Sequence, residues 1–241
     1  KVANMAVQFK PLGESAVLVY FGNAISEEIH LSIKKFLSLL EKEPFDGLIE
    51  VVPSYTNVCV YYDVMAVDQW DIEGRSPYEK VVSRLQRLLQ KEIDLPKEKK
   101  RLVEIPVCYG GIYGPDLTEI TRIHHLTEKE VIEIHTKNDY LVYMLGFAPG
   151  FPFLGGMDER IATPRKETPR LKIPAGSVGI AGKQTGIYPL ETPGGWQIIG
   201  RTPLKLFLPD QNPPTLLRAG DRIRFVPITE KEFMELEGER S

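Results

Sequence analysis

The chain has 241 residues, of which 42% are hydrophobic and 26% are charged, and its formal net charge is −3 at pH 7. This length and composition can supply a sizeable hydrophobic core, in one large domain or two small ones. The slightly acidic balance argues against a general nucleic-acid surface or an anionic-membrane surface.

The two cysteines, Cys59 and Cys108, lie inside apparent strands without CxxC spacing. A disulfide scaffold or a zinc site is therefore not expected, and reduced thiols in a cytoplasmic protein are the default interpretation. No apolar run reaches the length of about 18 residues that a membrane span needs, and no apolar signal region begins the chain. We therefore expect a cytoplasmic protein without a membrane partner.

The first 95 residues have the pattern of a small α+β domain. Strands alternate with amphipathic helices, and Ser26 precedes the first apolar stripe as a predicted N-cap. Ser76 and Glu79 form a capping box around Pro77, which indicates the start of a second helix. This order predicts an antiparallel sheet with helices on one face. The expected strands are Val7–Lys10, Ala16–Phe21, Leu48–Val52 and Asn57–Tyr62.

The charged, proline-bearing stretch Asp94–Arg101 is the predicted linker to a second domain, residues 96–241. The second domain opens with an expected strand, Leu102–Tyr109. A short helix near Pro115–His124 and a helix opened by Thr127 follow, and then another strand, Asp139–Leu145. From there to residue 227 the chain shows short strands between strong turn signals, which is typical of a mainly β barrel or a compact sandwich.

Residues 146–203 are the most informative segment. They contain 11 of the 20 glycines and 8 of the 19 prolines, and they carry 7 Lys and Arg against 4 Asp and Glu. Aromatic and β-branched residues interrupt the glycines and prolines throughout, so the segment is expected to fold. Glycine permits positive φ and close backbone approach, and proline fixes φ. The pattern therefore predicts shaped loops between short strands, where binding residues tend to lie.

The same segment carries a family resemblance. Its blocks GFAPGFPFLGG (146–156), PRKETPR (164–170), IPAGSVGIAGKQTGIYP (173–189) and TPGGWQIIGRTP (192–203) resemble the signatures of one family. Upstream blocks PLGESAVLVYFG (11–22) and EVVPSYTNVCVYYD (50–63) extend the similarity over nearly the whole chain. The family is that of the 5-oxoprolinase B subunit, also called allophanate hydrolase subunit 1, and it includes the inhibitor of the sporulation sensor kinase.

The resemblance implies a cyclophilin-like β-barrel and a subunit of the ATP-dependent 5-oxoprolinase, which opens 5-oxoproline to glutamate. The implied partners are a larger subunit, similar to allophanate hydrolase subunit 2, and a third subunit. ATP is the implied co-substrate of the complex. The chain has no GxxxxGK[ST] motif and no Gly-x-Ser-x-Gly elbow. We therefore expect the chain alone to bind no ATP and to be inactive.

Two arginines are candidate substrate-binding residues. Arg165 and Arg170 lie between prolines in PRKETPR, so a stiff extended loop would hold both guanidinium groups. Arginine forks bind carboxylates bidentately, as a carboxylated substrate requires. The alternative is a surface ion pair with Glu167 or Glu191.

Gln184, Thr185 and Tyr188 occur in a glycine-flanked turn and offer an amide and two hydroxyls. These groups could bind a lactam, or they could stabilise the loop by hydrogen bonds. Trp196 could form the floor of a pocket or fill the barrel core. The cluster Phe147, Phe151 and Phe153 fits a barrel core, a pocket wall or an exposed partner surface, and the sequence does not rank these.

Of the four histidines, His135 is the candidate catalytic residue, because its helix leads into the strand that enters the 146–156 block. A structural histidine is the alternative. No pair of histidines has ligand spacing with a carboxylate, so we predict neither a metal nor an organic cofactor.

The alternative function is a regulatory protein that inhibits a sensor histidine kinase through its barrel domain, using an exposed apolar patch. A urea or allophanate pathway component is a third interpretation. It is weaker, because no biotin-attachment segment of the AMKM type occurs in the chain.

The predicted linker can be tested by limited proteolysis. Trypsin should cut first within Lys97–Arg101, because exposed, charged, proline-bearing backbone is the preferred site of nicking. Two stable fragments of about 11 and 16 kDa should survive, as the sizes of the two expected domains require. Resistance to cleavage at these positions would mean that the two halves share one core.

Overall fold

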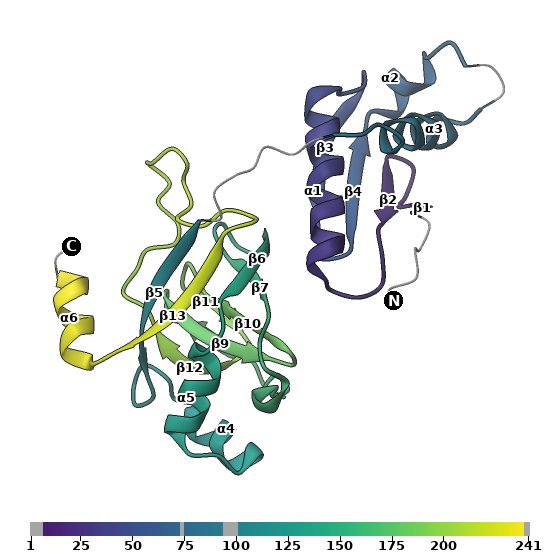
Figure 1. Ribbon diagram of the computed structural model, residues 1–241. Coiled ribbons are helices and arrows are strands. Elements are labelled where there is room, and N and C mark those ends of the chain that lie inside the picture. Colours follow the sequence, from purple (N-terminus) through teal and green to yellow (C-terminus); the bar gives the residue numbers. More distant parts are fainter. Residues whose placement is uncertain (1–6, 73–74, 94–100, 239–241) are drawn as a thin grey trace. The chain divides into compact units, whose positions relative to one another are not determined.

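The computed structural model describes residues 7–72, 75–93 and 101–238. The chain divides into two compact units, Lys1–Glu98 and Lys99–Ser241 (Figure 1). The predicted linker Asp94–Arg101 and the predicted domain boundary near residue 95 fall on residues 94–100, which lie outside the described residues, and on Arg101, which pairs with Asp221.

The first unit is a four-stranded antiparallel sheet in the order β1-β2-β4-β3, with helices packed against it. Val17 and Val19 of β2 pair with Val60 and Val58 of β4, and all four side chains are buried on the helix-covered face. The predicted α+β arrangement is therefore confirmed. The elements are β1 (Gln8–Pro11), β2 (Ala16–Tyr20), α1 (Glu27–Lys42), β3 (Leu48–Pro53), β4 (Asn57–Tyr62), α2 (Val64–Asp68) and α3 (Pro77–Leu89).

The helices begin where the sequence predicts. The hydroxyl of Ser26 accepts from the Ile29 amide at the start of α1. At the start of α3, the carboxylate of Glu79 accepts from the amide of Ser76 at 2.8 Å, which completes the capping box. The short helix α2 was not predicted, because five residues are too few to show a helical period; Asp63 caps it through two backbone amides.

The second unit is a mixed barrel of seven strands in the order β10-β9-β12-β5-β13-β6-β7. The edge strands β10 and β7 lie against each other, which nearly closes the sheet. The prediction of a mainly β barrel is therefore confirmed. The barrel strands are β5 (Leu102–Tyr109), β6 (Tyr140–Leu145), β7 (Pro152–Gly155), β9 (Ser177–Ala181), β10 (Gln184–Ile187), β12 (Gln197–Arg201) and β13 (Arg222–Ile228).

One strand pair of the barrel is parallel. β13 runs alongside β5 with Arg222 opposite Leu102, whereas the other strand pairs of this sheet are antiparallel. The predicted helices between β5 and β6 are present, and α5 packs on β13 while α4 contacts β12. The remaining elements are α4 (Leu117–His124), α5 (Glu128–Thr136), a 3-10 turn (Glu159–Ile161), β8 (Arg170–Ile173), β11 (Thr192–Gly194) and α6 (Glu230–Gly238).

A separate aromatic cluster lies beside the main barrel core, where the two-stranded sheet β8–β11 joins the barrel. Its buried members include Phe151, Tyr188 and Trp196. The glycine- and proline-rich segment thus folds into strands and shaped loops, as predicted, and it contributes every residue of this cluster.

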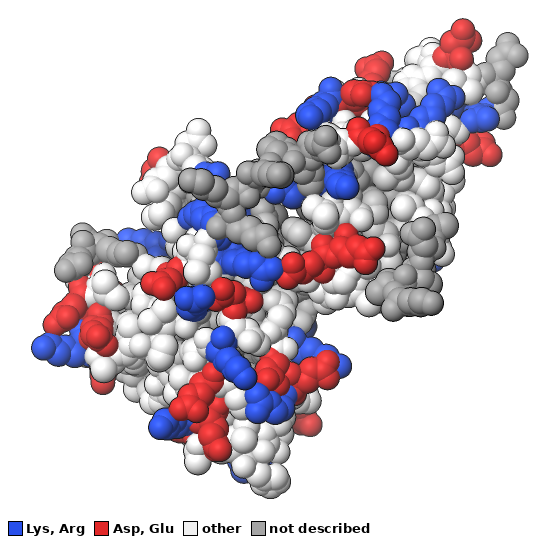
Figure 2. Space-filling model, in the orientation of Figure 1, with Lys and Arg blue, Asp and Glu red and all other residues white. Residues whose placement is uncertain are grey.

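Charged side chains are distributed over both units. In Figure 2, blue and red residues are interspersed on the face shown, and neither sign dominates it. Among the described residues on this face there is no broad basic field of the kind that attracts a nucleic-acid backbone.

The capping box of α3 provides a stability test of the first unit. Ser76→Ala removes the acceptor for the Glu79 amide, so we expect the free energy of unfolding to fall by about 1 kcal/mol. Urea titration monitored by Trp70 fluorescence, in a Trp196→Phe background, reports the first unit alone. The control is Ser32→Ala on α1, where the hydroxyl only bonds the Glu28 carbonyl on an exposed surface. Equal stability losses in the two variants would contradict a specific capping contribution.

Candidate functional site

An open aromatic pocket of about 600 Å³ lies on the second unit. It is formed by the loop between β6 and β7, the 165–169 segment, Tyr188 after β10, and the chain from β11 to the start of β12. The lining residues are Phe147, Ala148, Phe151, Phe153, Arg165, Pro169, Tyr188, Thr192, Pro193, Gly194, Gly195 and Trp196. Its walls are mainly apolar, with few polar groups, as is typical of small-molecule sites.

Phe151 is the centre of the pocket wall. Its ring makes edge-to-face contacts with Phe153, Tyr188 and Trp196, with centroids 5.1–5.6 Å apart. A Cβ on Gly186 would lie 2.9 Å from the Phe151 ring. Because Gly186 has no side chain, the Phe151 ring can occupy this position. The aromatic rings can then pack against one another at the floor of the pocket.

Phe147 stands at the mouth of the pocket in a strained backbone conformation. Its φ is +67°, which only one other non-glycine among the described residues shares in sign, and its side chain is 72% exposed. Positive φ is unfavourable for a bulky L-residue and persists where the surrounding structure enforces it, often at binding sites. An exposed aromatic ring held in this way is suited to contact a ligand or a partner.

Arg165 is the one charged residue that lines the pocket. Among the described residues its side chain makes no hydrogen bond or ion pair. Burial raises the pKa of the nearby Tyr188 hydroxyl, and a backbone hydrogen bond from Trp196 and the charge of Arg165 oppose this rise. The pocket therefore presents a cation and a neutral phenol beside apolar rings, which is a suitable environment for a small anion with an apolar body.

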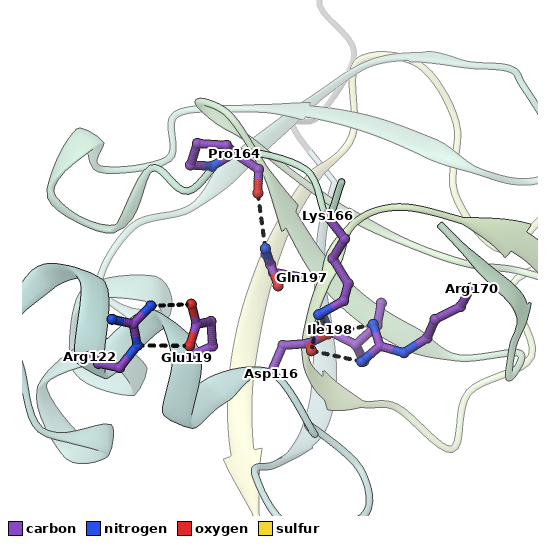
Figure 3. Close-up of polar contacts among 8 residues, drawn as sticks. All are labelled: Asp116, Glu119, Arg122, Pro164, Lys166, Arg170, Gln197 and Ile198. Carbon is purple, nitrogen blue, oxygen red and sulfur yellow. Dashed lines mark hydrogen bonds and ion pairs between the residues drawn. The ribbon is translucent and has the colours of Figure 1, made fainter. Parts of the chain in front are cut away.

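Asp116 lies behind the pocket loop and was not identified from the sequence. Its buried carboxylate accepts two hydrogen bonds of 2.7 Å from the Arg170 guanidinium, one of 3.1 Å from Lys166 Nζ and one of 2.7 Å from the Ile198 amide (Figure 3). Burial alone would raise the pKa of Asp116, but these donors outweigh it and lower the pKa below its ordinary value. No sequence pattern pairs residues 116 and 170.

The structure brings three of the seven predicted site residues to the pocket, namely Arg165, Tyr188 and Trp196. Arg170 is bound to Asp116, and not to Glu167 or Glu191. Gln184 is half-buried at the start of β10 and is not among the lining residues. His135 and Thr185 are fully buried.

His135 and Thr185 form a hydrogen-bonded pair inside the barrel. The Thr185 hydroxyl donates to the Gly179 carbonyl, so its oxygen is free to accept from His135 Nε2 at 2.9 Å. His135 Nδ1 then accepts from the Tyr109 hydroxyl at 2.8 Å. Burial lowers the pKa of His135 to about 3, so the imidazole is neutral. The ring is a satisfied core group stacked on Phe225, and it does not line the pocket.

Within the described ranges, no group of three His, Cys, Asp or Glu side chains could hold a metal ion. Cys59 and Cys108 are both free and buried. None of the described helices combines the length and the apolar character that crossing a membrane requires.

Comparisons with known proteins first define the class. The sequence model of one protein family, the carboxyltransferase domain, subdomain C and D, matches residues 7–217 of this chain. The urea amidolyase of Kluyveromyces lactis is similar at a TM-score of 0.78 and 19% identity, covering 99% of this chain and 16% of that one, which shows the fold alone. A conserved uncharacterised protein of Pyrococcus horikoshii has a TM-score of 0.55 and 50% identity, and the match covers 94% of this chain and all of that chain.

The curated relatives are more specific. The 5-oxoprolinase B subunit of Bacillus subtilis (strain 168) is 52% identical over 94% of this chain and 95% of its own length. The 5-oxoprolinase B subunit of Escherichia coli O157:H7 is 42% identical over 91% of this chain and 95% of its own length. The chain belongs to the family of 5-oxoprolinase B subunits, as its sequence blocks predicted.

The burial of His135 predicts a pH dependence of stability. An unfolded chain takes up a proton on this histidine near pH 6.5, whereas the folded chain does so only near pH 3. The free energy of unfolding should therefore fall as the pH falls from about 6.5, with a contribution of up to about 1.4 kcal/mol per pH unit. The measurement is urea unfolding monitored by Trp196 fluorescence in a Trp70→Phe background.

The matched variant is His135→Gln in the same background, because it keeps a donor and an acceptor but does not titrate. Its stability should change less between pH 6.5 and pH 5 than that of the parent. The two proteins differ only at residue 135, so the difference between their pH profiles isolates His135. Equal slopes in the two proteins would contradict a neutral, buried imidazole.

Proposed function

We propose that the chain is a subunit of an ATP-dependent 5-oxoprolinase, which acts with partner subunits to open 5-oxoproline to glutamate. The observation that carries the proposal is the close, nearly full-length similarity to relatives named as the B subunit of 5-oxoprolinase. The aromatic pocket supports it, because the substrate combines a carboxylate with a compact ring and Arg165 lines the pocket without an ion pair to any described residue.

The chemistry explains why several subunits and ATP would be needed. A lactam is a stable amide, so water alone attacks its carbonyl carbon slowly. Transfer of the γ-phosphoryl group of ATP to the carbonyl oxygen activates that carbon. Water then adds to it, the ring C–N bond breaks with the nitrogen leaving as an amine, and a second water hydrolyses the resulting acyl phosphate to glutamate and phosphate.

This chain's part in the reaction would be to bind and orient the substrate. Arg165 would donate charge-assisted hydrogen bonds to the carboxylate, and the faces formed by Phe151 and Trp196 would contact the ring. The neutral Tyr188 hydroxyl could donate to or accept from the lactam amide. The sequence has no nucleotide-binding motif, so ATP would be held by a partner or between subunits.

The size of the pocket supports a shared site. A five-membered lactam fills only a small part of about 600 Å³. The exposed ring of Phe147 at the mouth would then face a partner subunit, whose side chains complete the enclosure and exclude water. The larger and the third 5-oxoprolinase subunits are the partners we infer.

The other predicted site residues have more distant roles in this proposal. Arg170 would hold the loop through Asp116, and His135 with Thr185 would brace β10 from inside the barrel. Gln184 would act at the turn between β9 and β10. A catalytic role for His135 and inhibition of a sensor kinase stay predictions, since neither gains support from a described contact.

Reconstitution tests the proposal. The chain alone should hydrolyse neither 5-oxoproline nor ATP, whereas a mixture with the two partner subunits should couple 5-oxoproline-dependent ATP hydrolysis to glutamate formation. Appreciable turnover by the isolated chain would contradict a shared site. A complete mixture without activity would contradict the assigned reaction.

Arg165→Met should raise KM for 5-oxoproline in the reconstituted enzyme about 10- to 100-fold, with a smaller effect on kcat. The expected size corresponds to the loss of one charge-assisted hydrogen bond, about 1.5–3 kcal/mol. The matched control is Arg160→Met, because Arg160 pairs with Asp158 on the surface and does not line the pocket. An unchanged KM in Arg165→Met would remove Arg165 from the site.

A further inference from the structure

Hydrogen bonds hold the backbone on both sides of Arg165. The carbonyl of Pro164 accepts a hydrogen bond of 3.1 Å from Gln197 Nε2, and the amide of Lys166 donates one of 2.7 Å to the Gly195 carbonyl. Between these bonds, the guanidinium of Arg165 is exposed and has no hydrogen bond or ion pair to any described residue. A fixed backbone therefore carries a free cationic group at the pocket wall.

Asp116 contacts the residues next to both of these hydrogen bonds. The carboxylate of Asp116 accepts from the Ile198 amide, and the Asp116 amide donates to the Ile198 carbonyl at 2.9 Å, so it is fixed to β12 directly after Gln197. The same carboxylate holds Lys166 and Arg170 on the other side of Arg165 (Figure 3). The segment 164–170 is thus fastened to β12 from its start to its end.

The side chain of Gln197 lowers the stability of the folded state. Its side chain is 6% exposed, and its Oε1 has no hydrogen-bond partner among the described residues. An unpartnered buried acceptor destabilises the folded state, and a methionine of similar shape would lack this penalty. The one hydrogen bond that its amide nitrogen donates goes to the residue before Arg165.

We propose that Gln197 and Asp116 are positioning residues that hold Arg165 in place for the substrate carboxylate. The proposal rests on the function inferred above and names residues for it that the sequence did not indicate. A cation on an ordered segment loses little conformational entropy on binding, so its hydrogen bonds to the ligand contribute more fully to affinity. A loosely held Arg165 would bind the same carboxylate more weakly.

The decisive variant is Gln197→Met, because a positioning role and a purely structural role predict different results. The midpoint of thermal unfolding should stay constant or rise, since a half-satisfied polar group is removed. KM for 5-oxoproline in the reconstituted enzyme should rise about tenfold, with kcat nearly constant. An unchanged KM, or a loss of stability and activity together, would overturn the proposal.

A double-mutant cycle distinguishes action through Arg165 from an independent effect. Once Arg165→Met has removed the guanidinium, adding Gln197→Met should change kcat/KM little further. Multiplicative losses in the double variant would show that Gln197 acts elsewhere. Lys166→Met is a second test of the same arrangement, because it removes one hydrogen bond to Asp116 and leaves the Arg170–Asp116 pair in place.

A measurement on the isolated chain separates this proposal from the function itself. The ¹⁵N relaxation of the Arg165 Nε–Hε group reports how ordered the guanidinium is. The signal is assigned because it is absent from the spectrum of Arg165→Met. Gln197→Met should make this group more mobile than in the wild type. Asp139→Asn is the control, because it weakens an arginine–aspartate pair, Arg224–Asp139, whose residues do not line the pocket.

The order of Arg165 and the activity of the reconstituted mixture together separate the two proposals. Unchanged order of Arg165 in Gln197→Met, or equal mobility in the control, would overturn the positioning role even if the reconstituted enzyme is active. Increased mobility with an inactive reconstituted mixture would support the positioning role and reject the 5-oxoprolinase reaction.

Discussion

The arrangement around the pocket depends on the carboxylate of Asp116. A buried charge is unfavourable unless hydrogen-bond donors surround it. Here an arginine, a lysine and a backbone amide supply them, and they come from two segments far apart in the sequence. The residue therefore joins the start of α4, the strand β12 and the proline-flanked loop that bears Arg165. Because Arg170 and Lys166 are partly exposed, their ion pairs with Asp116 stabilise the fold less than buried pairs would. These contacts still fix the positions of the segments that they join.

The density of glycine in residues 146–203 has a physical explanation in the pocket. A Cβ on Gly194 would lie 2.4 Å from the Tyr188 hydroxyl, an even closer conflict than that between Gly186 and Phe151. These positions must lack side chains for the aromatic rings to pack edge to face. The prolines of the same segment stiffen the loops between them. The result is a rigid apolar surface with a single cation, which suits a small anion better than a flexible polar loop would.

The barrel interior contains a polar contact that serves a different purpose. His135 connects α5 to β10 through Thr185 and to β5 through Tyr109, with every polar atom of the ring satisfied. A polar network of this kind fixes which helix lies against which strand. The neutral state of the imidazole follows from its burial, since no described acid lies close enough to stabilise a charge. The residues of this unit that are open to a ligand therefore lie at the surface pocket, whereas His135 lies in the barrel core.

The sequence by itself determined the local features of this protein. Capping boxes at Ser76 and Thr127 marked helix starts, strong turn signals marked a barrel of short strands, and the glycine-rich blocks indicated both the family and the segment that contains the pocket. These features depend on contacts within a few residues, so they can be seen in a linear pattern. The tertiary structure decided which side chains face the pocket. It placed Thr185 and His135 inside the barrel, paired Arg170 with Asp116, and aligned β13 parallel to β5. It also placed Arg165 at the pocket without an ion pair to any described residue. Such outcomes depend on strand order and on contacts between residues at least 50 positions apart in the sequence, and a single sequence carries no signal for contacts at that separation.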